Sequence, residues 1–323
     1  MTATPMNAPQ QILFIVIEPK TRSDHEKLAQ GLRKLMAEDS TFRIDSDAQS
    51  GQTIAHGVDE LQLERIVDRL KRESHVALTV GKPQIAYKET VTQMADGKGR
   101  YARQIRGRGH YAHAEIRLSP GKPGSGYIFE SRAIGKAIPK KFIQSIDEGI
   151  IEALTRGVVA GYPVDDVQVE LYGGSFHEVD SSEEAFRIAG SMAFQDAAKK
   201  ASPVLLEPIM VAEVVVPEEY TGNVIDDLNS RRGCFEGMEL RGETQIIKSS
   251  VPLSEMLGYA SDLHGRTNGR ATYSMHFDRY EPLPGGPHND DEDRMAPVVV
   301  PRRPTPKGKV SGVALPEPDN TGC

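Results

Sequence analysis

The segment of this chain with the clearest potential for binding chemistry is residues 103–117, RQIRGRGHYAHAEIR. Guanidinium groups bind phosphates, glycine lets the backbone approach a ligand closely, and flat rings stack on bases, so this combination is typical of contacts to irregular RNA. The alternative is a plain hairpin loop in which the glycines only supply unusual backbone angles. The residues that carry this interpretation are Arg103, Arg106, Gly107, Arg108, Gly109, His110, Tyr111, His113 and Arg117.

A second candidate segment is residues 171–186, LYGGSFHEVDSSEEAF, which places His177 in a short loop before a helix. The paired glycines at 173–174 are expected to break the preceding strand, and a capping box of Ser181 and Glu184 is expected to start the helix. An exposed histidine in such a loop can hydrogen-bond an RNA backbone or a base edge. In the alternative, the glycines only make a turn and His177 has no part in binding.

Signatures of catalysis and of metal binding are weak. His110 and His113, with His177 and Glu178, suggest a metal site, but two histidines three residues apart on a strand point in different directions and no cysteine pair supports them. The sequence shows no recognisable nucleophile signature and no G-x-x-x-x-G-K-[ST] phosphate loop. We therefore expect no catalytic residue, no metal and no cofactor-binding residue in this chain.

Composition favours a cytoplasmic globular protein. The chain has 323 residues and a formal net charge of -7, with only two cysteines and no apolar run long enough to span a membrane or act as a secretory signal. The negative charge disfavours long-range attraction to nucleic acid, but phosphate contacts depend on local basic clusters such as the one at 103–117.

Hydrophobic periodicity predicts an α+β fold in which two ferredoxin-like βαββαβ units flank a central α+β unit. In the last unit, the pattern predicts a single short helix at 253–263. The polar start is expected to be a loose leader, and the end, rich in Pro, Gly and charge, a disordered tail. The predicted boundaries are 1–10 for the leader, 11–82, 83–203 and 204–283 for the three units, and 284–323 for the tail.

Between about residues 12 and 280 the chain contains, in this order, the strings IEPKT, GQTI, VDRLKRE, GKPQIAYKET, GRGHY, IPKKFI, HEVDSSEEAFRIAGSMAF, LEPIM, DLNSRRG and PLSEMLGYASDLHGRTNGRA. Together these strings resemble elongation factor G, a translational GTPase. The resemblance implies that the three units correspond to the third, fourth and fifth domains of that family. It implies partners as well: the ribosome, at the decoding region of the small subunit and the factor-binding centre of the large subunit, together with tRNA and mRNA.

Two sets of site residues follow from this resemblance. The central unit would contact tRNA and mRNA through a tip made of Gly107, Arg108, Gly109, His110, Tyr111, Ser175, Phe176 and His177. The last unit would contact ribosomal RNA through Gly258, Tyr259, Asp262, Leu263, Arg266 and Arg270.

The sequence also departs from the family pattern. Asp59 and Gln62 replace the usual Gly and His, His110 replaces a common Gln, and Gly173 replaces a common Asp. No GTPase domain is recognisable, so we expect a ribosome-binding module that acts in or regulates translocation without hydrolysing GTP itself. GTP would be a cofactor only if a separately encoded GTPase half is a partner of this chain. The alternatives are one piece of a full translocation GTPase and an inert remnant.

Overall fold

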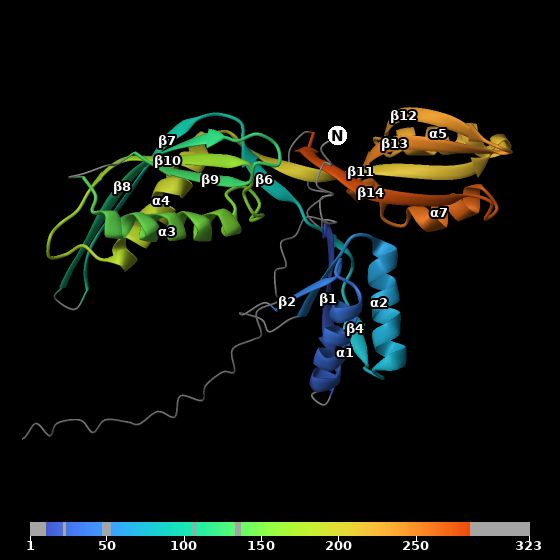
Figure 1. Cartoon of the computed structure of the whole chain (residues 1–323), viewed down its shortest axis with the longest axis horizontal. Coiled ribbons are helices and arrows are strands. Elements are labelled where there is room, and N and C mark those ends of the chain that lie inside the picture. Colours follow the sequence, from blue (N-terminus) through green and yellow to red (C-terminus); the bar gives the residue numbers. More distant parts are fainter. Residues whose placement is uncertain (1–10, 22–23, 47–52, 106–107, 133–136, 285–323) are drawn as a thin grey trace, which may run out of the picture.

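The structure is a computed structural model that describes residues 11–21, 24–46, 53–105, 108–132 and 137–284. Three α+β units follow one another along the chain (Figure 1). The expected leader, Gly107 and all but the first residue of the expected tail lie outside the described residues. No helix in the described ranges is long and apolar enough to cross a membrane.

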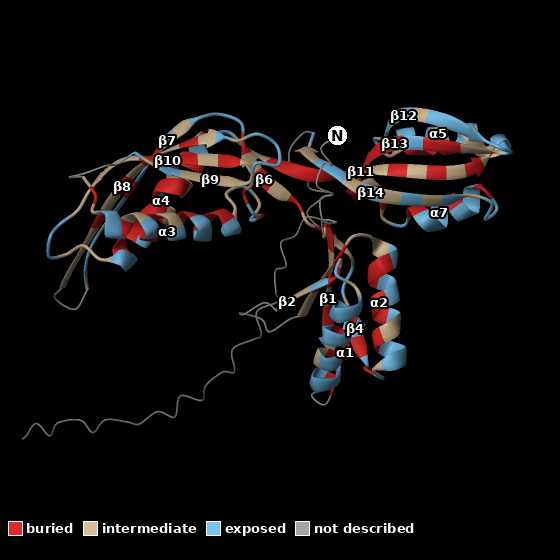
Figure 2. Cartoon of the chain, in the orientation of Figure 1, coloured by how far each residue is buried: buried red, intermediate tan, exposed pale blue. Residues whose placement is uncertain are grey.

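The first unit is a four-stranded antiparallel sheet with two helices, and its strand order β2-β3-β1-β4 is ferredoxin-like, as predicted. Both helices are amphipathic, and their apolar stripes, which include Leu32 and Leu70, are buried in the core (Figure 2). A short strand, β5, extends this sheet by pairing with β1. The elements are β1 (Leu13–Pro19), α1 (Asp24–Glu38), β2 (Arg43–Ser46), β3 (Thr53–Gly57), α2 (Glu60–Glu73), β4 (Leu78–Val80) and β5 (Gln84–Ile85).

The central unit has a sheet in the order β7-β8-β10-β9, in which β9 and β10 are parallel and the other pairs antiparallel. Helices α3 and α4 lie on one face of this sheet, and the other face carries no helix (Figure 1). The elements are β6 (Lys88–Val91), β7 (Ala95–Ile105), β8 (Arg108–Pro120), β9 (Tyr127–Ser131), a 3-10 turn (Lys140–Phe142), α3 (Ile143–Arg156), β10 (Val167–Ser175) and α4 (Glu183–Lys200).

Helices α3 and α4 approach each other closely enough for backbone contact, because glycines lie where they cross. A Cβ atom at Gly149 would lie 1.9 Å from the carbonyl oxygen of Arg187, and one at Gly190 would lie 2.4 Å from that of Ile146. Real Cβ atoms do not approach backbone oxygens this closely, so the crossing depends on the absence of side chains at both positions.

The C-terminal unit repeats the topology of the first, with strand order β12-β13-β11-β14. The predicted single helix at 253–263 is wrong: the first of two short helices ends at Met256, Leu257 is extended, and Gly258, with a left-handed φ of 75°, precedes the second helix. The elements are β11 (Pro203–Pro217), a 3-10 turn (Glu218–Tyr220), α5 (Thr221–Ser230), β12 (Cys234–Arg241), β13 (Thr244–Pro252), α6 (Leu253–Met256), α7 (Tyr259–Arg266) and β14 (Thr272–Pro282).

The central and C-terminal units are joined by strand pairing. The first residues of β11, Pro203 to Leu206, pair with β6, and the rest of β11 continues between β13 and β14. Lys88, in β6, forms an ion pair of 2.5 Å with Asp165 and lies 4.6 Å from the centre of the Tyr280 ring in β14. Strand β6, which precedes β7 of the central unit, is therefore an added strand of the C-terminal sheet, and side-chain contacts reinforce the junction.

Next to this junction, the buried carboxylate of Glu89 organises the loop between α3 and β10. Its two oxygens accept hydrogen bonds of 2.5 to 3.1 Å from the backbone N–H groups of residues 158–162. Gly157 and Gly161 have φ of 65° and 89°, which lets the loop curl around the carboxylate. Successive N–H groups turned to one centre form an anion-binding nest, here occupied by a side chain of the same chain.

Candidate nucleic-acid interface

The two segments singled out by the sequence meet at one end of the central unit. The backbone N–H of Tyr111, in β8, donates to the carbonyl oxygen of Asp180 at 2.8 Å, and the Ser181 hydroxyl donates to the carbonyl oxygen of Tyr111 at 2.7 Å. The hydroxyls of Tyr111 and Ser175 are 2.8 Å apart. These contacts bind the β7–β8 hairpin to the loop that follows β10, and we call the described part of this assembly (residues 108–111 and 175–182) the tip.

Gly109 allows the two segments to touch. A Cβ atom at position 109 would lie 2.5 Å from Asp180 Cγ, so any side chain would displace the Asp180 carboxylate. Arg108 pairs with Ile105 at the end of the β7–β8 ladder, which places its backbone beside Gly109 at the outer end of the hairpin. The Arg108 side chain lies outside the described residues.

His177 lies at the surface of the tip, with its side chain 57% exposed. Its backbone N–H donates to the Ser181 hydroxyl at 2.9 Å, and its Nδ1 accepts from the backbone N–H of Asp180 at 3.2 Å and lies 3.3 Å from the Asp180 carboxylate. Contacts within the loop therefore hold the Nδ1 edge of the ring, while Nε2 has no partner among the described residues. That nitrogen is free to bind an external group.

The expectation that paired glycines break the strand before this loop is wrong. Strand β10 continues through Gly173 and Gly174 to Ser175, with a β-bulge between Leu171 and Gly173. A Cβ atom at Gly174 would lie 2.3 Å from the carbonyl oxygen of His113, so the glycine permits close strand packing. Pairing with β8 resumes after the bulge and continues to Ser175, which places Ser175 at the tip.

The predicted capping box is also wrong in its residues. Ser182, one position further on, caps α4 by accepting from the backbone N–H of Ala185 at 3.2 Å. The hydroxyl of Ser181 is already engaged, as it accepts from His177 and donates to Tyr111. The two adjacent serines thus have different roles: Ser182 caps the helix, and Ser181 links the loop to the hairpin.

Replacing Ser181 by alanine is expected to loosen the tip, because the substitution leaves the His177 N–H and the Tyr111 carbonyl without this partner. The bond to His177 is exposed and the bond to Tyr111 is part-buried, so each contributes about 1 kcal/mol or less, and hydrogen exchange at residues 177–181 should accelerate. Ser182→Ala is the matched control, since it weakens the helix cap by about 1 kcal/mol but keeps the contact between loop and hairpin. Equal acceleration in both variants would contradict the role assigned to Ser181.

Phe176 differs from the other predicted tip residues, because it is half-buried and packs against the core of the central unit. His110 is also half-buried, and it faces Arg103 across the β7–β8 ladder. Within the described residues, no group of three or more His, Cys, Asp or Glu side chains is arranged to hold a metal ion.

The second predicted surface, in the C-terminal unit, needs correction at two residues. Tyr259 is fully buried, with its ring edge-on to that of Tyr273 at 5.0 Å, and Leu263 is 3% exposed in the same core. Both lie on the inner side of α7, since positions four apart share one face of a helix. Their side chains are therefore core residues and do not belong to an RNA-contacting surface.

The other predicted residues of this surface are exposed. Gly258 precedes α7, and its N–H donates to Glu60 of the first unit at 3.0 Å. The charged residues are each paired within the unit: Asp262 with Arg231 at 2.5 Å, Arg266 with Asp227 at 3.1 Å, and Arg270 with Glu219. These pairs fix the arginines in place at the surface.

Asp59 and Gln62, which depart from the family pattern, have structural roles. Asp59 caps α2 by accepting from the Gln62 N–H at 2.6 Å. The Gln62 amide is buried, accepts from the Val58 N–H at 2.8 Å, and donates to Asp39 at 2.7 Å and to Thr41 at 2.6 Å. Both side chains are thus used within the first unit.

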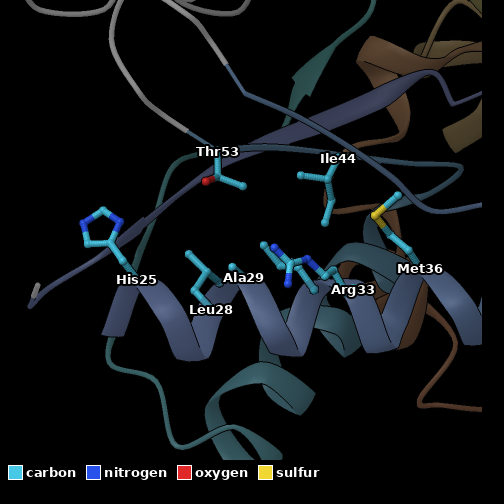
Figure 3. Close-up of a pocket in the computed structure, with 8 residues that line it drawn as sticks. His25, Leu28, Ala29, Arg33, Met36, Ile44 and Thr53 are labelled. Carbon is cyan, nitrogen blue, oxygen red and sulfur yellow. The ribbon is translucent and has the colours of Figure 1, made fainter. Parts of the chain in front are cut away.

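A shallow pocket of about 380 Å³ also occurs in the first unit, along α1 and the edge of its sheet (Figure 3). It is far from the tip and its lining is mixed in character, with Leu28 and Met36 beside His25 and Arg33. It brings together none of the residues predicted from the sequence.

The fold defines a three-domain α+β protein whose central domain carries a loop assembly at its outer end. Residues 8–82 match the family model for elongation factor G domain III, residues 83–202 the model for domain IV, and residues 204–290 the model for the elongation factor G C-terminus. The chain belongs to the elongation factor G family, and the three matched models are domains other than the GTPase domain.

A crystal structure of a protein from Thermus thermophilus is similar in fold and in sequence. It shares 38% identity with this chain and superimposes with a TM-score of 0.69 over 87% of the chain. The match covers 42% of the Thermus chain, so this chain spans less than half of that protein's length.

Proposed function

We propose that this protein is a ribosome-binding module that acts in translocation or regulates it, by contacting tRNA and mRNA through the tip of its central domain. Family membership supports a role in translation elongation. The module would act by shape and by RNA contact, without hydrolysing GTP itself.

The observation that carries this proposal is the union of two distant segments at the tip. Tyr111, Ser175 and Ser181 link a hairpin rich in arginine and glycine to a loop that exposes His177. A cation, free ring nitrogens and close backbone approach suit single-stranded or irregular RNA. The exposed arginines of the C-terminal domain, Arg266 and Arg270, would exchange their carboxylate partners, Asp227 and Glu219, for ribosomal RNA of the large subunit, because ion pairs at the surface are weak.

Sedimentation with purified ribosomes tests the proposal. We expect the protein to pellet with ribosomes and to be released as salt rises, because counterions compete for phosphate contacts. Absence of salt-sensitive co-sedimentation would overturn the proposal.

Replacing Arg108 or His177 by alanine is expected to weaken ribosome binding by roughly tenfold or more, the equivalent of one charged hydrogen bond. Arg132→Ala is the control, because Arg132 lies directly after β9, pairs with Glu170 at 3.1 Å and is not part of the tip. Circular dichroism should show all three variants folded. If the tip variants bind like the control, the assigned roles are wrong.

The share of the Thermus chain that is matched favours a second candidate, in which this chain is one piece of a full translocation GTPase or works with a separate GTPase half. A phosphate-loop motif encoded directly upstream of Met1 would support the first form. The second form predicts that ribosome binding becomes dependent on GTP when a GTPase half is added.

A further inference from the structure

The sheet of the central domain presents one face that no helix covers, and this face begins at the tip. Along β7, Gly97 and Gly99 are buried against α4, where added Cβ atoms would meet backbone oxygens of that helix. The alternate residues Lys98 and Arg100 are exposed, because successive strand residues point to opposite faces. Both cations therefore lie on the open face.

Away from the tip, the cations of the open face form ion pairs with carboxylates of the same face. Lys98 pairs with Glu115 at 2.9 Å and Arg117 with Asp96 at 2.9 Å. The hydrogen bonds to these carboxylates raise the pKa of Lys98 and the pKa of Arg117. Each of these cations would have to give up a carboxylate partner before it could bind a phosphate, whereas an unpaired cation would not.

Arg100, which lies on β7 two residues nearer the tip than Lys98, does not share this ion pairing. Arg100 is exposed and forms no ion pair with any carboxylate in the described part of the chain; its guanidinium carbon lies 5.9 Å from the centre of the Tyr111 ring. In the strand register, Arg100 faces His113, and His113 faces Ser175 on β10. His113 Nδ1 and the Ser175 hydroxyl are 3.3 Å apart, and the same hydroxyl contacts Tyr111.

We propose that Arg100, held over the ring of Tyr111, is a phosphate-binding subsite for an RNA backbone that leaves the tip along the open face. The inference rests on the proposed function and deepens it, by adding a binding residue outside the tip and by setting the limit of the RNA path. Glu115, which follows His113 on the same face of β8 and pairs with Lys98, marks that limit.

The chemistry favours a phosphate at this position. A guanidinium that is not neutralised by a carboxylate keeps its planar set of donors available for phosphate oxygens. Contact with an aromatic face restrains the long side chain, so less conformational freedom is lost on binding. Beyond Arg100, the next cation, Lys98, is already paired with Glu115 at 2.9 Å, so a phosphate gains less there than at Arg100.

The salt dependence of binding tests this subsite. For Arg100→Ala, we expect the affinity for ribosomes to fall roughly tenfold at low salt. The slope of log K against log salt should become shallower by about 0.7 to 0.9, the loss of one phosphate contact. Arg100→Lys should restore the slope and part of the affinity, because it keeps the charge but not the planar fork.

Arg187→Ala is the control, since Arg187 is an exposed arginine of the same domain that lies on α4, on the helix-covered side of the sheet, and pairs with Glu152 at 3.6 Å. A second probe, an unstructured RNA oligonucleotide, separates this inference from the proposed function. If wild-type protein does not bind ribosomes but Arg100→Ala weakens oligonucleotide binding, the ribosomal role fails and the subsite stands. If Arg100→Ala leaves both slopes unchanged, or Arg187→Ala changes them equally, the subsite is refuted.

Discussion

Replacing Glu89 by alanine is expected to lower the free energy of unfolding of the central domain by at least about 4 kcal/mol, which is in the upper range for a single substitution. Glu89 is 0% exposed and is the acceptor for the N–H groups of residues 158–162. The Tyr162 bond is buried and the other four are part-buried; a buried donor left without a partner costs about 1 to 3 kcal/mol, and all five bonds are lost together with the packing of the side chain.

Urea denaturation and hydrogen exchange at residues 158–162 would measure this effect. Glu89→Gln, which keeps the shape but not the charge, should give a smaller loss, because one acceptor oxygen remains. Glu130→Ala is the control: this exposed glutamate lies 3.9 Å from Arg132 and should change stability by no more than about 0.5 kcal/mol. Unaltered exchange at residues 158–162 in Glu89→Ala would show that the loop does not depend on the carboxylate.

The second large effect is expected at the crossing of α3 and α4. Gly149→Ala should destabilise the central domain by about 3 kcal/mol or more, because the new methyl group would lie 1.9 Å from a backbone oxygen and the helices must move apart. A flexible side chain could yield to such a contact, but a helix backbone cannot yield without losing other contacts in the core.

Gly222→Ala is the matched control, because Gly222 also lies in a helix, α5, but an added Cβ atom there would meet nothing within 4 Å. Alanine has the higher helix propensity, so this variant should be neutral or more stable by up to about 1 kcal/mol. Thermal denaturation of both variants would compare them directly. A Gly149→Ala protein as stable as Gly222→Ala would mean that the helix crossing tolerates a side chain.

Local patterns were sufficient to predict most of the fold. Leu28, Leu32 and Leu35 recur at helical spacing in α1, and all three are buried as that spacing requires. Alternating residues marked the strands, and the order of elements led to the correct ferredoxin-like topology twice. These predictions succeeded because they depend on residues close together in the sequence.

The errors arose where distant residues decide the structure. Gly174 looks like a strand breaker, but its neighbour is the carbonyl of His113 on another strand. Ser181 matches a capping box, but its hydroxyl is bound to Tyr111, 70 residues away. Tyr259 belongs to a motif associated with RNA contact, yet its ring packs in the core against Tyr273. The role of Glu89 in the loop could not be predicted, because a single glutamate in a strand gives no local signal of an anion-binding nest.

Strand β11 has a mechanical consequence. Because its first residues pair with β6 and its later residues pair with β13 and β14, bending the junction would require breaking ladder hydrogen bonds. A force applied at the outer end of the central domain would therefore be transmitted to the C-terminal domain with little rotation at the junction. An insertion that interrupts β11 near Leu206 would allow the two domains to rotate relative to each other.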